Sequence, residues 1–173
     1  MHKLVTLHQK RISKTCIGTN STHSSLAAGG LNTIRKNLCL IIDLNDVASC
    51  KNDLDFKVML DSFTSKLKQK ISIPVNQQHW GICRKAINLY LRDCYYNKVL
   101  NEHFKLDKIA SFLESPIDSL AMKSLSQHTS TVMKTAIKML NKTTHHEWQK
   151  AATLFSKANG LANRVDADLL IYE

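Results

Sequence analysis

Residues 53–71 read DLDFKVMLDSFTSKLKQKI, and this stretch is the strongest indicator of the fold class. Its apolar side chains recur at three- and four-residue steps, which places them on one stripe of a helix. These side chains are Phe56, Met59, Leu60, Phe63, Leu67 and Ile71. Pro74 then ends the pattern, because proline lacks the amide donor and biases its predecessor away from helical angles. The stretch therefore predicts an amphipathic helix that packs on other helices.

Helical spacing continues after this stretch. We predict further helices at 80–97, 106–113, 117–127, 130–140 and 144–160, with Ser115 as N-cap and Pro116 opening the third of these. The run Leu38–Ile42 fits either a strand or a buried helical turn, and the tail 164–173 fits either a helix or extended chain. Only 2 Pro and 5 Gly punctuate the chain, too few for a many-stranded sheet protein. The predicted fold class is all-α.

A length of 173 residues suits one compact helical domain with a single real core. We divide this single domain, residues 1–173, into three parts. Residues 1–33 form a basic N-terminal segment with a loose polar loop. Residues 53–127 and 130–173 hold the central helices and the C-terminal helices. We expect a cleft between the helical layers.

The chain carries an excess of positive charge. Lys and Arg number 24 against 14 Asp and Glu, a formal net charge of +10. Residues 1–42 and 62–92 contain Lys and Arg but no acidic residue, which is typical of a docking face for a polyanion. We therefore expect a nucleic acid as the partner. A merely cationic protein, or one that meets an acidic protein, is the alternative.

The sequence gives little support for a metal or cofactor site, a membrane span or a secretion signal. The 5 cysteines form no CxxC pair and no zinc-finger spacing, so we expect reduced thiols, no metal and no cofactor. The longest apolar run is far shorter than the roughly 18 residues of a membrane span. No secretion signal is visible at the N-terminus. We expect a monomeric, cytoplasmic protein associated with the nucleoid and not with a membrane.

Residues 80–91, WGICRKAINLYL, carry the most chemical information. A glycine turn that opens directly into a helix exposes unpaired amides, and these amides with the helix dipole form a seat for phosphate. We expect Arg84 and Arg92 to face outward beside that seat. The predicted DNA-binding residues are Trp80, Gly81, Ile82, Cys83, Arg84 and Arg92.

Residues 81–91 resemble the second half of the helix-hairpin-helix motif of the DNA glycosylases in the endonuclease III superfamily. The resemblance implies that the partner is double-stranded DNA and that Lys85 is the nucleophile of a bifunctional enzyme. It also implies a catalytic aspartate at the start of a later helix, supplied here by Asp118 in Ile117-Asp118-Ser119-Leu120. The separation of 33 residues (118 − 85) is similar to that in the archaeal 8-oxoguanine DNA glycosylase branch.

The chain departs from the family at several positions. Cys83 replaces the second hairpin glycine, Leu120 stands where the family has histidine, and the iron–sulfur cysteines are missing. We expect a DNA glycosylase, with or without lyase activity through a lysine Schiff base, in which Lys85 and Asp118 converge in one cleft. The alternative is a non-catalytic helix-hairpin-helix protein that grips duplex DNA, for example in a defence or mobile-element system.

Overall fold

The computed structural model describes residues 2–18, 26, 29–71, 79–129 and 136–172. Every regular element within these ranges is a helix, so the predicted all-α class is confirmed. The α-helices are α1 (His2–Thr15), α2 (Gly30–Ile41), α3 (Leu44–Ala48), α4 (Asp53–Lys70), α5 (Trp80–Tyr96), α6 (Lys98–Phe104), α7 (Ser119–Leu125), α8 (Lys142–Ala158) and α9 (Ala167–Ile171). The 3-10 turns are η1 (Leu106–Phe112), η2 (Ser126–His128), η3 (Ile137–Met139) and η4 (Arg164–Asp166).

Helix α4 forms where the 53–71 pattern predicts it, and its ends explain its length. The Asn52 side chain caps the start by accepting from the Asp55 amide at 2.9 Å. Acidic residues occupy the first turn and lysines the last, an order that complements the helix dipole. The apolar stripe of α4 is buried against α2 and α5.

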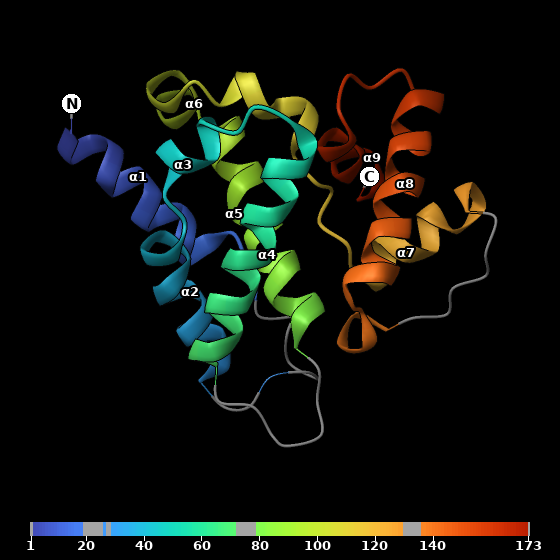
Figure 1. Cartoon of the computed structure of the whole chain (residues 1–173), viewed down its shortest axis with the longest axis horizontal. Coiled ribbons are helices and arrows are strands. Elements are labelled where there is room, and N and C mark those ends of the chain that lie inside the picture. Colours follow the sequence, from blue (N-terminus) through green and yellow to red (C-terminus); the bar gives the residue numbers. More distant parts are fainter. Residues whose placement is uncertain (1, 19–25, 27–28, 72–78, 130–135, 173) are drawn as a thin grey trace.

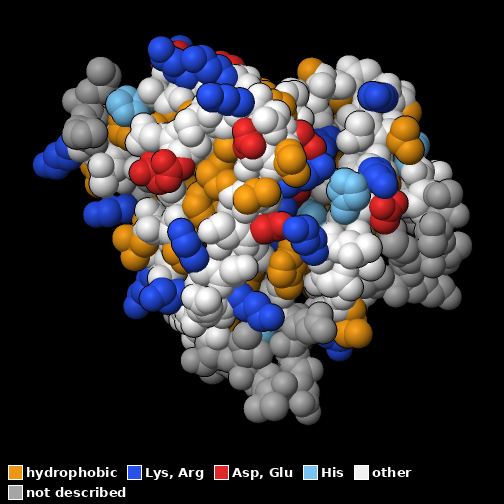
Figure 2. Space-filling view, viewed as in Figure 1, with side chains coloured by type: hydrophobic (Ala, Val, Ile, Leu, Met, Phe, Trp, Pro, Cys, Tyr) orange, Lys and Arg blue, Asp and Glu red, His pale blue; other side chains and the backbone are white. Residues whose placement is uncertain are grey.

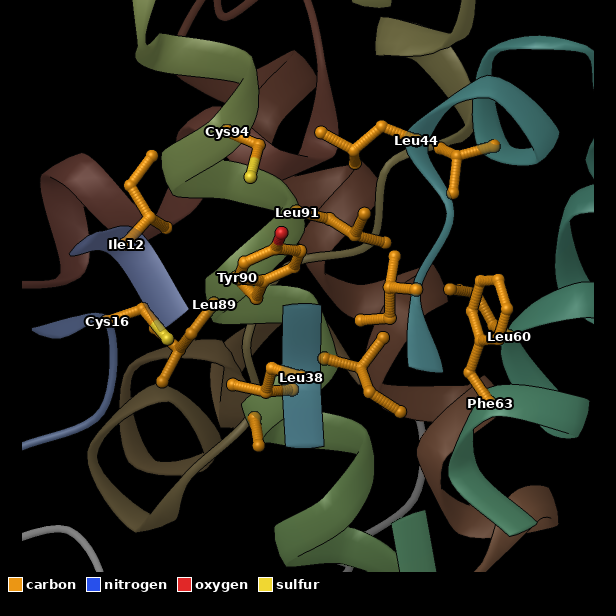
Figure 3. Close-up of a cluster of buried hydrophobic side chains, with 14 of the residues drawn as sticks. Ile12, Cys16, Leu38, Leu44, Leu60, Phe63, Leu89, Tyr90, Leu91 and Cys94 are labelled. Carbon is orange, nitrogen blue, oxygen red and sulfur yellow. The ribbon is translucent and has the colours of Figure 1, made fainter. Parts of the chain in front are cut away.

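Helix α5 is the centre of the first hydrophobic cluster, which is built from α1 to α6 and η1. Residues 81–91 are buried on every side of the helix, as expected for a helix surrounded by others. Figure 3 shows Tyr90 in the middle of this cluster, between Ile12 of α1, Leu38 of α2 and Leu60 of α4. The ambiguous run Leu38–Ile42 is thus largely the end of helix α2.

Helices α7, α8 and α9 surround a second, smaller hydrophobic cluster. Figure 1 shows these helices on one side of the molecule and α1 to α3 on the other, with α4 and α5 between them. The cluster comprises Ile117, Ala121, Met122, Leu125, Leu140, Trp148, Ala151, Ala152, Ala167 and Ile171. Two separate cores therefore meet along α5 and the segment that leads into α7.

Three predicted helix boundaries are wrong. Helix α7 begins at Ser119 with Asp118 as its N-cap, because the Asp118 side chain accepts from two amides of the first turn. Most of the predicted helix 130–140 lies outside the described residues, and its remaining part is the short 3-10 turn η3. Helix α8 starts before Thr144, with Asn141 and Thr144 as its capping box. Within the ranges that the structure describes, no helix is both long and apolar enough to cross a membrane.

Candidate functional site

A pocket of about 430 Å³ lies where the two hydrophobic clusters meet. The end of α1, the middle of α5 and the tail α9 form its walls, and the start of α7 closes one side. Its lining residues are Cys16, Lys85, Leu89, Arg92, Asp93, Tyr96, Asp118, Asp168, Leu169 and Tyr172. The volume falls in the range of about 300–1,000 Å³ that is typical of small-ligand sites.

Lys85 and Asp118, predicted to converge, do converge in this pocket. Lys85 Nζ lies 2.8 Å from Asp118 Oδ2, and both side chains are largely buried. Asp118 Oδ1 accepts from the amides of Leu120 and Ala121 at 3.0 and 2.9 Å and so caps α7. One carboxylate oxygen is thus fixed by the backbone while the other faces the amine.

The charge of Asp118 is set by opposing effects. Burial raises the pKa of its carboxyl, but the Lys85 ammonium and hydrogen bonds from Ala121 and Tyr172 outweigh burial and hold the pKa below its ordinary value. The Tyr172 hydroxyl contacts the same Oδ2 that faces Lys85. Asp118 is therefore ionised at neutral pH and has two partners on its pocket side.

Further carboxylates give the pocket an acidic excess. Arg92 pairs with Asp93 at 2.7 Å and also contacts Asp168, which is 4% exposed. Burial is the main effect on both acids and raises the pKa of each, although Arg92 opposes it. With Asp118 the lining holds three carboxyls against two cations. This balance disfavours a phosphate inside the pocket and suits a neutral group.

The rim of the pocket is apolar and partly open to solvent. Tyr96, Leu169 and Tyr172 are 41%, 55% and 50% exposed. The Tyr96 hydroxyl donates to Asp166 Oδ1 at 2.8 Å, which holds the end of α5 against η4. Half-exposed rings at the mouth of a pocket can stack on a planar ligand.

The neighbouring residue on α5, Arg84, lies inside the protein and not on its surface. Its guanidinium donates to Glu114 at 2.8 and 3.1 Å and to Asp61 at 3.1 Å, and its side chain is 3% exposed. Glu114 also accepts from Asn88 and contacts His145 Nε2 at 2.8 Å. Burial opposes the ionisation of Glu114, but His145 and Arg84 hold its pKa well below the ordinary value. This network joins α4, α5 and α8.

The predicted phosphate seat at Gly81 is therefore wrong. A Cβ atom at Gly81 would lie 2.4 Å from the Ile137 carbonyl oxygen and 2.7 Å from Leu140 Cβ, so the start of α5 is covered by the segment around η3. Ile82 and Cys83 are buried in the first cluster. The loop that would complete the hairpin, residues 72–78, lies outside the described residues.

Trp80 and Arg92, which the sequence also predicts to bind DNA, contact other residues of the protein instead. Trp80 is half-buried, with its ring 5.3 Å from His145 in an edge contact and the Arg84 guanidinium 5.4 Å from its centroid. Arg92 does not face outward but lines the pocket between two carboxylates. The predicted contact of Trp80 with DNA does not fit this packing.

The tail 164–173, for which the sequence predicts no functional role, supplies Asp168, Leu169 and Tyr172 to the pocket. Asp168 is buried against Arg92, and Tyr172 reaches Asp118, 54 residues earlier in the chain. The spacing of Asp168 and Tyr172 at i and i+4 was the available signal, because it places both side chains on one helix face.

The structure thus brings the Lys85 amine and the Asp118 carboxylate together, while the start of α5 at Gly81 is covered. Within the described part of the chain, no cluster of His, Cys, Asp and Glu has the arrangement to hold a metal ion. Comparison with protein-family models, with curated proteins and with solved structures found no match to this chain.

Proposed function

We propose that this protein removes a damaged or modified base from duplex DNA, with Lys85 as the nucleophile and Asp118 as its acidic partner. The observation that carries the proposal is the 2.8 Å contact between Lys85 Nζ and Asp118 Oδ2 at the wall of a 430 Å³ pocket. The resemblance to the endonuclease III superfamily requires this pair to meet, although 33 residues separate its members.

The chemistry requires a neutral amine. Lysine attacks a carbon only after losing its proton, and the Asp118 carboxylate is the nearest acceptor for that proton. The amine then forms a bond to sugar C1′ while the bond from C1′ to the base breaks, and the departing base keeps the electron pair and takes up a proton. Loss of a second proton from the nitrogen is followed by opening of the C1′–O4′ bond. O4′ keeps the electron pair and takes up a proton, and a protonated Schiff base remains at C1′.

The charge balance of the pocket fits this use. A base with its sugar is neutral, and three carboxyls against two cations do not repel it as they would repel a phosphate. A base must leave the duplex to reach the pocket, and the half-exposed rings of Tyr96 and Tyr172 offer it a stacking surface at the mouth.

Borohydride trapping tests the proposal. The protein is incubated with duplexes that carry an abasic site, uracil, 8-oxoguanine or 3-methyladenine, and the covalent adduct is measured after reduction. We expect an adduct with the wild type and none with Lys85→Met, while the exposed Lys123→Met retains it. Alkaline strand cleavage detects base loss without an adduct. Duplex binding with neither adduct nor base loss would contradict the proposal.

A second candidate is a non-catalytic protein that binds duplex DNA. It is favoured by the position of the Lys85–Asp118 pair, which joins the two hydrophobic clusters just as the buried Arg84–Glu114 pair does. In that case Lys85→Met lowers the free energy of unfolding, and no duplex in the panel reacts with the wild type.

A further inference from the structure

A second cavity, of about 470 Å³, lies between α1 and α2, and it differs from the first in its charge. We call it the α1–α2 groove; its lining residues are Lys10, Ser13, Lys14, Asn32, Arg35, Lys36, Cys39 and Leu40. Four of them carry positive charge. No acidic residue lines the groove, and none occurs anywhere in residues 1–42.

The positive charge of the groove is not neutralised. Among the described residues, no carboxylate forms an ion pair with Lys10, Lys14, Arg35 or Lys36. The three lysines are exposed. The Arg35 guanidinium donates to the Ile17 carbonyl oxygen at 2.6 and 3.2 Å. This neutral partner holds the side chain in place but does not neutralise its positive charge.

The walls of the groove are fixed to each other. The Ser13 hydroxyl of α1 donates to the Arg35 carbonyl oxygen of α2 and accepts from the Cys39 amide at 3.4 Å. Figure 2 shows Lys and Arg side chains, with some Asp and Glu between them, over the left of the view, where α1, α2, α3 and part of α4 lie in Figure 1. The surface that lines the groove is mostly apolar, so the charge belongs to the exposed lysine ends along it, and these suit a polyanion that passes over the groove.

The groove lies next to the Lys85 pocket. Lys14 lines the groove, while Cys16, two residues later, lines the pocket. Charges from both cavities act on the Cys16 thiol, whose pKa is raised to about 12: burial is the main cause, Asp93 adds to it, and Arg92 and Arg35 oppose it. The acidic pocket and the basic groove therefore share the C-terminal turn of α1.

We infer that the α1–α2 groove binds the phosphate backbone of the duplex whose base enters the Lys85 pocket. This inference rests on the proposed function and replaces the phosphate seat that the buried Gly81 cannot provide. The division of charge matches the ligand, because phosphates meet the cations of the groove and the neutral base meets the acidic pocket.

The test compares two triple variants with the same loss of charge. The groove variant carries Lys10→Gln, Lys14→Gln and Lys36→Gln. The control variant carries Lys51→Gln, Lys108→Gln and Lys157→Gln, three exposed lysines outside the groove. Circular dichroism checks that both are folded. Binding to a fluorescent 20-base-pair duplex with an abasic site is measured by anisotropy between 50 and 300 mM salt.

We expect the groove variant to bind roughly 10- to 100-fold more weakly at 100 mM salt, with a salt slope smaller by about 2.7, because each lost phosphate contact removes about 0.9. The control variant should keep the wild-type slope. Equal losses in both variants, or a wild type that binds no duplex, would overturn the inference. So would equally tight binding of polyglutamate, which would indicate an acidic protein partner.

The groove inference and the proposed function can fail independently of each other. Trapping through Lys85 is measured at protein concentrations that saturate both variants. If the groove variant loses affinity and the wild type still forms no adduct or product, the groove inference stands and the catalytic proposal fails. If Lys85-dependent adducts form but both variants bind alike, catalysis stands and the groove does not bind the backbone.

Discussion

Replacing Glu114 by glutamine tests the buried network most directly. The Glu114 carboxylate is 4% exposed and has four short contacts, two with Arg84, one with Asn88 and one with His145. A glutamine keeps one acceptor oxygen and turns an NH2 group toward donors, so at least two charge-assisted bonds are lost. At about 1.5 kcal/mol for each such bond, the free energy of unfolding should fall by about 3 kcal/mol. This agrees with the roughly 3–5 kcal/mol for breaking a buried ion pair.

Urea unfolding at pH 7, followed by circular dichroism, measures this loss. Glu147→Gln is the matched control: Glu147 pairs with Lys150 at 2.9 Å, but both side chains are exposed, so no measurable change is expected. Because the folded-state pKa of Glu114 is lowered, the difference between wild type and Glu114→Gln should be complete above the ordinary pKa of 4.5 and shrink as the pH falls below it. A loss below about 1 kcal/mol at pH 7 would refute the assignment of an essential buried charge.

The remaining predictions concern the caps, the close contacts and the thiols. Asp118→Asn should abolish base removal yet keep the cap of α7, whereas Asp118→Ala should cost about 1 kcal/mol more in urea unfolding. Equal stabilities of the Asp118→Asn and Asp118→Ala variants would contradict the role of Asp118 Oδ1 as the cap of α7. Gly81→Ala should destabilise by about 1–3 kcal/mol because its Cβ would meet a carbonyl oxygen at 2.4 Å, while Gly18→Ala, with open space, should be near neutral. Burial raises the pKa of Cys16 and Cys83 to about 12. These thiols should therefore react with a disulfide reagent at pH 8 only after unfolding, and rapid native labelling of either would show that it is not buried.

The sequence predicted the elements whose apolar residues repeat without interruption. The stripe in 53–71 and the run 80–97 each became a helix with nearly the expected bounds, because such a face is stable only when it is packed. The pairing of Lys85 with Asp118 followed from the resemblance, since each residue alone is an ordinary lysine or helix cap.

What the sequence could not predict depends on contacts between distant segments. Arg84 and Lys85 are adjacent and alike in charge, and only the fold determines that one meets Glu114 inside the protein and the other faces a pocket. The tail was equally ambiguous, because five residues of helix carry little periodicity. The i, i+4 spacing places Asp168 and Tyr172 on one helix face, but only the packing of α9 on α7 and α8 brings that face to the site.

The adjacent attachments of Arg84 and Lys85 have a mechanical consequence. They hold the two ends of one short segment, Glu114 to Asp118, and Gln149 adds hydrogen bonds of 2.7 and 3.0 Å to Ser115, next to Glu114. A ligand that inserts between Lys85 and Asp118 breaks one ion pair of this segment. The contacts of Glu114 with Arg84 and of Ser115 with Gln149 stay in place, so the two hydrophobic clusters remain packed against each other.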